Sequence, residues 1–131
     1  MHPQKYLKGE APKRVVVSID KSYRLIHEDR LGEFYVYVLV ATKLGIKNAS
    51  KVAEGWDGDK VLLLNNGTHE LLIWKTLWET SLDAREFYDA LVQIAEMQGV
   101  KEDGSYRVGD MMVSIKMRGK EVELKAIESL N

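Results

Sequence analysis

The chain has 131 residues, 45% of them apolar, and its 19 basic residues nearly balance its 20 acidic residues. A chain of this length suits a single domain that buries about two thirds of its unfolded surface without disulfides or a structural metal. The charge balance argues against a general attraction to nucleic acid or to an anionic membrane, and the lack of cysteine excludes disulfides, thiolate zinc sites and a cysteine nucleophile.

The sequence predicts a cytoplasmic protein. Its longest apolar run, residues 34–41, is too short to cross a bilayer. The opening MHPQKYLKGEAPK contains neither the hydrophobic stretch nor the small-residue cleavage site of a signal peptide. Lysine and glutamate are abundant whereas asparagine and glutamine are scarce, a composition that resembles that of thermophilic proteins.

Residues 1–14 are polar, contain both prolines and lack periodicity, so we expect an extended N-terminal arm followed by one domain over residues 15–131. The β-branched run at residues 15–19 predicts the first strand of that domain.

Residues 31–44 contain FYVYVLV, which by propensity alone favours a strand. Three features favour a helix instead. Asp29 suits an N-cap, Gly45 suits a C-cap, and the apolar side chains at 31, 35, 38 and 39 fall on one helical face. We predict a helix, and a strand over residues 34–41 is the alternative.

A short second helix is expected over residues 49–54, with Asn48 as its N-cap and Gly55 at its end. The Trp-Asp-Gly-Asp of residues 56–59 then predicts a tight turn, because aspartate accepts hydrogen bonds from nearby N–H groups and glycine tolerates positive φ. We expect the Trp56 indole to anchor this turn on the core.

Asn66-Gly67 lies between the apolar runs 60–65 and 68–79 and predicts a type I′ hairpin. With Asn65 opposite Thr68, Val61 lies opposite Leu72. The second strand is apolar on both faces, with Leu72, Trp74 and Trp78 on one and Leu71, Ile73 and Leu77 on the other. Such a strand is covered on both faces, so we expect either helices on each side of the sheet or one face that docks a partner.

The clearest helix begins at Thr80, with Asp83 completing a capping-box-like start, and ends at Gly99. Its apolar residues recur at helical spacing: Ala84, Phe87, Tyr88, Leu91, Ile94 and Ala95. The KEDG of residues 101–104 then predicts a loop.

A second hairpin is expected over residues 111–126, turning at Arg118-Gly119 with Met117 opposite Lys120. One face is apolar and the other polar, and Gly109-Asp110 breaks or bulges the strand that starts near residue 106. The predicted class is α+β, with a mainly antiparallel sheet of two hairpins plus a short N-terminal strand, packed with one long and two shorter helices.

Six residues near the first hairpin are candidate functional or fold-defining residues: Trp56, Asp57, Asp59, Trp74, Trp78 and Tyr88. The two carboxylates suit a calcium or magnesium site, but such a loop needs further oxygen ligands, so turn capping explains them better. The aromatic residues suit a ligand pocket or, more simply, the core. We assign no catalytic, metal or cofactor-binding residue and predict no cofactor.

Other polar motifs are weaker. His69-Glu70 opens like the zinc-binding HExxH, but the fifth residue is Ile73. His27 beside acidic residues could transfer protons, although a histidine there is typically only solvated. The basic residues of the 111–126 hairpin could follow a nucleic-acid backbone, but Glu121 and Glu123 among them reduce the positive field.

Three blocks carry a resemblance to a known family: GWDGDK at residues 55–60, WKTLW at 74–78 and DAREF at 83–87. They resemble the GWxGD[KR], WxTxW and DAxEF motifs in the C-terminal half of an uncharacterised bacterial and archaeal family. The opening HPQKYLKGEAP resembles that family's HPxKYxxGExP linker, and LGEF at residues 31–34 resembles the start of its next helix.

The N-terminal half of that family resembles an HExxH zinc metallopeptidase, and this chain contains no such helix. The resemblance therefore implies a shared fold around Trp56, Asp59, Trp74 and Trp78, with no catalytic residue to transfer.

From these observations we expect a non-catalytic accessory or protein-interaction domain that stands alone where relatives have it fused to a peptidase-like half. Its expected partner is a separately encoded peptidase-like chain or a second copy in a homodimer. One alternative is a small-ligand-binding protein or enzyme with a cleft near residues 56–59. The other alternative is weak nucleic-acid binding through the 111–126 hairpin. We expect no membrane partner.

Overall fold

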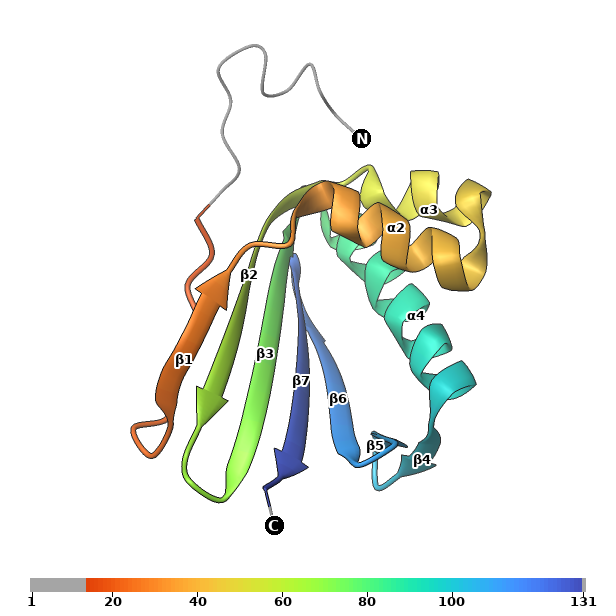
Figure 1. The fold of residues 1–131 in the computed structure, drawn as a ribbon. Coiled ribbons are helices and arrows are strands. Elements are labelled where there is room, and N and C mark those ends of the chain that lie inside the picture. Colours follow the sequence, from red (N-terminus) through yellow and green to blue (C-terminus); the bar gives the residue numbers. More distant parts are fainter. Residues whose placement is uncertain (1–13, 131) are drawn as a thin grey trace.

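The computed structural model describes residues 14–130, so nearly all of the expected N-terminal arm lies outside the described residues. The described part contains three helices and one seven-stranded antiparallel sheet (Figure 1). In chain order the elements are β1 (Arg24–Asp29), α2 (Gly32–Leu44), α3 (Ile46–Ala53), β2 (Trp56–Asn65), β3 (His69–Trp78), α4 (Ser81–Gln98), β4 (Val100–Glu102), β5 (Ser105–Val108), β6 (Met111–Arg118) and β7 (Glu121–Ser129).

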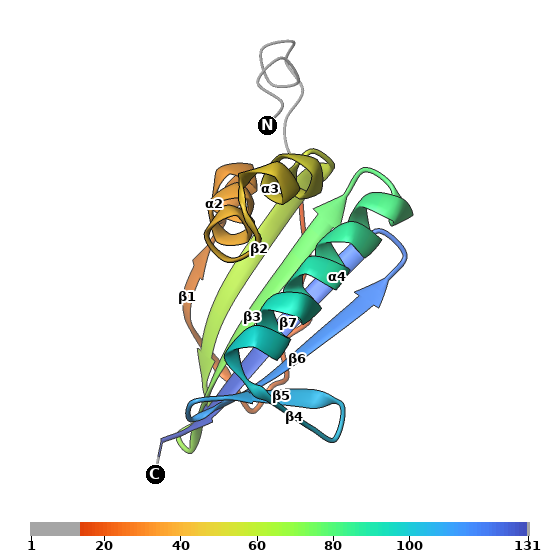
Figure 2. The same cartoon turned by 90° about the vertical axis from the view of Figure 1, so that its right-hand side faces the viewer.

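The strands lie in the order β1-β2-β3-β7-β6-β5-β4. All three helices lie on one face of this sheet, where α4 runs diagonally across its middle and α2 and α3 lie together beside one end of α4 (Figures 1 and 2). The predicted α+β class with a mainly antiparallel sheet is confirmed, although the sheet is larger than predicted.

The segment whose composition fits a strand forms the helix α2, as predicted, and its predicted C-cap Gly45 is confirmed. Val36 and Val40 are fully buried, and the helix ends at Gly45, whose φ of 96° suits glycine and whose N–H donates to the carbonyl of Ala41. The buried face is not the predicted face of residues 31, 35, 38 and 39, because Tyr35 and Val38 are 44% and 42% exposed. Burial of Val36 and Val40 in the helix nevertheless outweighs the strand propensity of this segment.

The predicted start of α2 is wrong. The Asp29 carboxylate accepts a hydrogen bond from the neighbouring Arg30 N–H and does not cap the helix. Instead the Asp59 carboxylate, from β2, accepts the N–H groups of Leu31 and Gly32 at 2.8 and 2.9 Å. A residue 27 or 28 positions away thus supplies the oxygen that the local sequence was expected to supply.

The second helix also starts earlier than predicted, at Ile46 rather than residue 49. Asn48 lies inside α3, where its side-chain amide donates to the Leu44 carbonyl at the end of α2. The cap position falls instead on Gly45, which both ends α2 and begins α3.

The predicted strand at residues 15–19 does not form, and the first strand is β1 instead. Val17 packs beside Leu62, Leu64 and Ile73, a second apolar cluster separate from the main core. The β-branched run thus covers the sheet rather than extending it. Of the two alternatives for β3, the one with helices on each side of the sheet is wrong, because the segment before β1 covers part of the second face. The alternative, a partner docked on one face, stays a prediction.

Residues 56–59 form the start of β2 rather than a tight turn. Trp56 pairs with Trp78 and Gly58 pairs with Leu77, so Asp57 is the extra residue of a β-bulge. Pairing with β3 and burial of the Trp56 indole outweigh the local turn preference of Asp and Gly.

Both predicted hairpins form, but each register is displaced by two residues. Val61 pairs with Trp74, whereas the prediction placed it opposite Leu72. The first loop is longer than two residues because the Asn66 side chain accepts hydrogen bonds from the N–H groups of Thr68 and His69. Since side chains alternate with a period of two, this displacement leaves every side chain on its predicted face.

The second hairpin turns at Gly119-Lys120, and Arg118 pairs with Glu121. The short β4–β5 hairpin was not predicted. It turns at Asp103-Gly104, within the KEDG that was expected to form a loop. The strand expected from near residue 106 is β5, and Gly109-Asp110 breaks it, as predicted, by forming the turn into β6. These two additional strands make the sheet larger than expected.

The helix α4 is confirmed with its predicted ends. The Thr80 hydroxyl accepts the Asp83 N–H and donates to the Asp83 carboxylate, and the helix terminates at Gly99. Its apolar side packs over the sheet and buries Phe87 completely. Within residues 14–130, none of the helices has the length and apolar character needed to span a membrane.

Candidate functional site

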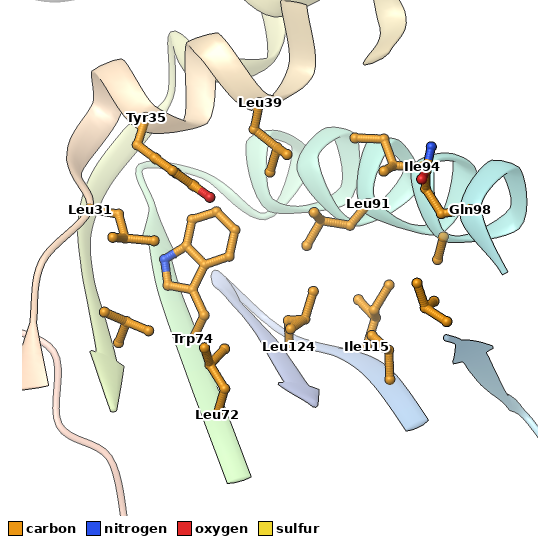
Figure 3. Close-up of a pocket in the computed structure, with 14 residues that line it drawn as sticks. Leu31, Tyr35, Leu39, Leu72, Trp74, Leu91, Ile94, Gln98, Ile115 and Leu124 are labelled. Carbon is orange, nitrogen blue, oxygen red and sulfur yellow. The ribbon is translucent and has the colours of Figure 1, made fainter. Parts of the chain in front are cut away.

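An apolar pocket of about 290 Å³ lies between α2, α4 and the helix-covered face of the sheet (Figure 3). Its floor is built from strands β2, β3, β7, β6 and β5, which contribute Val61, Leu72, Trp74, Leu124, Ile115, Val113 and Val108. Its walls come from Leu31 and α2 on one side and from α4 on the other. The pocket is therefore made by elements from most of the chain.

The residues of the two helical walls lie on one face of each helix because of their spacing in the sequence. Leu31, Tyr35 and Leu39 recur every four residues and so lie on one side of α2, above Trp74 (Figure 3). On α4, Leu91 and Gln98 are seven residues, or about two turns, apart and face the same space. The apolar side chains on one face of β6 and β7 complete the floor, because they point toward the helices by strand alternation.

Trp74 connects the pocket to the main core. Its ring lies edge-on to Tyr35, with centroids 5.7 Å apart, and edge-on to Phe87 at 5.6 Å. Such geometry is the favoured arrangement of aromatic pairs. Its indole N–H donates to the Asp59 carboxylate at 3.0 Å, so the polar edge of the ring is satisfied inside the protein.

Asp59 is 2% exposed and holds three donors: the N–H groups of Leu31 and Gly32 and the indole of Trp74. A carboxylate at a helix N-terminus is stabilised by the aligned backbone dipoles and by these hydrogen bonds. The residue therefore fixes the start of α2, which is one wall of the pocket, relative to the floor. Its role in this geometry is structural.

Of the six sequence-predicted candidates, Trp74 lines the pocket and Asp59 contacts it through Trp74. Trp78 is completely buried, with its ring centroid 4.8 Å from that of Phe87. The other three contribute to the fold: Trp56 and Asp57 are buried at the start of β2, and Tyr88 is half-buried against the main core. The structure thus brings Asp59 and Trp74 together. Of the six candidates, Trp74 alone is among the residues that line the pocket.

Sequence reasoning did not identify the pocket walls. The predicted apolar face of the helix comprised residues 31, 35, 38 and 39; Leu31, Tyr35 and Leu39 line the pocket, whereas Val38 is 42% exposed. The available signal was that residues 34–40 are apolar on every side of the helix, so more than one face needs cover. The floor residue Leu124 was expected only on the apolar face of the second hairpin, and Gln98 gave no signal of its own.

Glu33, Asp57 and Asp59 are buried, whereas the ion pairs Lys60–Glu28 and Arg107–Glu102 involve side chains that solvent reaches. A hydrogen bond from Lys60 lowers the pKa of the Glu28 carboxyl, and the two atoms Lys60 Nζ and Glu28 Oε1 are 2.8 Å apart. Arg107 likewise lowers the pKa of Glu102 through a hydrogen bond between their side chains. Residues 14–130 contain no cluster of three or more His, Asp or Glu side chains that could hold a metal.

Comparison with known proteins adds one relationship. No curated protein and no solved structure matches the chain. A family model described as "Domain of unknown function (DUF8575)" matches residues 21–128, from the turn before β1 to the end of β7, and therefore includes every residue of the pocket. The chain belongs to this family.

Proposed function

We propose that this protein is a non-catalytic binding domain that holds a small apolar molecule in the pocket between α2, α4 and the sheet. The observation that carries the proposal is the lining itself, which is almost entirely aliphatic and aromatic. Its volume of about 290 Å³ lies near the lower end of the range of about 300–1,000 Å³ for small-molecule sites.

The chemistry of the lining also favours binding over catalysis. The residues around the pocket are hydrophobic apart from the Tyr35 hydroxyl and the Gln98 amide, and neither forms a nucleophile–base pair with another lining residue. Acid–base chemistry needs a titratable group within hydrogen-bond reach of the substrate, and Tyr35 is the one titratable residue among the fourteen described residues that line the pocket. The buried carboxylate bonded to the pocket residue Trp74, that of Asp59, already accepts three hydrogen bonds from the fold.

The experiment is a fluorescence titration with 1-naphthylamine, a small dye that is uncharged at neutral pH, is within the size that the pocket volume allows, and changes its emission in apolar sites. We expect saturable binding to the native protein and its loss in Ala95→Leu, which adds bulk on the α4 wall of the pocket. The matched control is Glu96→Leu, which adds the same side chain at the next position, on the exposed side of α4. Equal dye binding by both variants would contradict the proposal.

A second candidate function is the protein-interaction role expected from the family resemblance. It is favoured by the outer face of α2 and the start of α3, where Phe34, Val38 and Ile46 are 62%, 42% and 69% exposed. Exposed apolar residues that gather on one surface are typical of contact sites. On this proposal the surface meets a second copy or a peptidase-like chain in the cytoplasm.

Light scattering over a concentration range tests self-association. The Phe34→Ser variant should then dissociate at a higher concentration than the native protein. For the peptidase-like partner, the separately expressed N-terminal half of a fused relative should co-elute with the native chain and not with Phe34→Ser. A monomer that binds no such half would count against this second candidate.

A further inference from the structure

The charge of the lining restricts what the pocket can hold. Within the described chain, fourteen residues line it, and none of them is Asp, Glu, Lys, Arg or His. A charged group placed inside would lose its hydration without gaining a counter-charge, which is strongly unfavourable. The part of a ligand that enters the pocket is therefore uncharged.

The shape of the pocket restricts the ligand further. The floor crosses five neighbouring strands, from Val61 on β2 to Val108 on β5. At about 4.8 Å between adjacent strands, this is a span of roughly 19 Å. A volume of about 290 Å³ distributed over that span makes a narrow trough rather than a round cavity. An elongated chain fits such a trough better than a compact ring system.

The size of the ligand can be estimated by comparing the pocket volume with that of a known apolar cavity. A cavity of about 150 Å³ accepts benzene, with six carbon atoms, so twice that volume accepts roughly twelve non-hydrogen atoms. The ligand is therefore about the size of a medium-length alkyl chain.

The polar groups give the ligand its orientation. The Tyr35 hydroxyl points into the pocket from α2, whereas Gln98 lies at the opposite end, on the last turn of α4 (Figure 3). The indole N–H of Trp74 is occupied by Asp59 and does not compete for the ligand. The inward direction of the Tyr35 hydroxyl makes it the natural partner for one oxygen atom of the ligand.

Resting on the proposed function, we infer that the pocket takes an uncharged, unbranched aliphatic molecule of roughly ten to twelve non-hydrogen atoms. Its hydroxyl or carbonyl oxygen bonds to the Tyr35 hydroxyl, and its chain lies along the floor toward Gln98. Medium-chain alcohols, esters and amides belong to this class.

Three probes with the same number of carbon atoms test the inference by isothermal titration calorimetry at pH 7.5: 1-decanol, decanoate and 1-adamantanol. We expect 1-decanol to bind at least tenfold more tightly than decanoate, whose carboxylate is ionised, and more tightly than the compact 1-adamantanol. Tyr35→Phe should weaken 1-decanol binding by roughly fivefold, the size of one hydrogen bond. Nitrogen–proton NMR spectra of the native protein should show 1-decanol shifting the Trp74 indole signal.

Each outcome has a distinct meaning. Decanoate or 1-adamantanol binding as tightly as 1-decanol would overturn the inferred ligand class, while dye binding that Ala95→Leu abolishes would leave the proposed function standing. An unchanged affinity in Tyr35→Phe would overturn the assigned orientation. If neither the dye nor any of the three probes binds, the inference and the proposed function both fail.

Discussion

Replacing Asp59 by asparagine tests whether this carboxylate, and not a local cap, holds the start of α2. In the native protein one carboxylate oxygen accepts the Leu31 N–H and the Trp74 indole N–H, and the other accepts the Gly32 N–H. Asparagine has one acceptor oxygen and one amino group. In its best orientation the oxygen keeps two donors, and the amino group faces the Gly32 N–H, where donor meets donor.

The cost can be worked from these contacts. One hydrogen bond to a charged group is lost, at about 1.5–3 kcal/mol, and the two that remain become neutral and weaker. The favourable interaction of the charge with the helix N-terminus also disappears, while removing a buried charge recovers part of its desolvation cost. The net expected loss is about 3 kcal/mol, a large fraction of the 5–15 kcal/mol typical of a domain.

Urea unfolding followed by circular dichroism measures this loss. With an m-value of about 2 kcal/mol/M, the midpoint should fall by roughly 1.5 M. The matched control is Asp29→Asn, which alters the exposed residue that the sequence indicated as the cap, and its effect should stay within about 0.5 kcal/mol. The reasoning is refuted if Asp59→Asn unfolds at the same urea concentration as Asp29→Asn.

Three further changes have defined outcomes. Gly55→Ala should lower the free energy of unfolding by about 2 kcal/mol or more, because the added methyl would overlap the Asp83 carboxylate; urea unfolding checks this. Thr80→Ala removes the N-cap of α4 and should cost about 1 kcal/mol by the same measurement. Because Lys60 lowers the pKa of Glu28, the pair stabilises the fold above the ordinary value of 4.5 and loses this effect as the pH falls through the lowered pKa. The melting temperatures of native protein and Lys60→Met should therefore differ most near neutral pH and converge in acid.

The elements that the sequence predicted well are those whose signals are local. The helix from Thr80 has a cap, a periodic apolar face and a terminating Gly99, all within one segment, and both ends are confirmed. The apolar and polar faces of the second hairpin are also confirmed, because strand alternation depends only on neighbouring residues. The type of an element and the orientation of its faces were thus readable from the residues themselves.

The features that were missed depend on residues distant in the chain. Local sequence placed the cap of α2 at Asp29, but the structure uses Asp59 on a neighbouring strand. Local turn preference placed a turn at residues 56–59, but pairing with β3 makes them a bulged strand. In the first hairpin, side-chain hydrogen bonds to Asn66 lengthen the loop and shift the register. In each case a partner that local patterns do not reveal decides between two reasonable conformations.

The pocket could not be predicted from the sequence either, because it depends on contacts between residues that are distant in the chain. Apolar residues at helical spacing predict that a face is covered, but not whether other side chains cover it completely. Tyr35 and Leu39 lie on a helical face of ordinary apolar composition, and the space beneath them is bounded by α2, α4 and the sheet together. Trp74 was predicted as a candidate residue because it is aromatic, but its place on the pocket floor is set by the pairing of β3 in the sheet.

Because Trp74 belongs to the core, to the Asp59 contact and to the pocket floor, ligand binding and folding should be coupled through one residue. A ligand that binds only the folded state stabilises it by RT ln(1 + [L]/Kd), about 2.7 kcal/mol at a hundred times Kd. That gain is close to the expected loss in Asp59→Asn. Saturating 1-decanol should therefore restore much of that variant's stability if the α2 wall still forms in it. If the wall no longer forms, the ligand will raise the stability of the native protein and leave the variant unchanged, which would place Asp59 among the residues that shape the site.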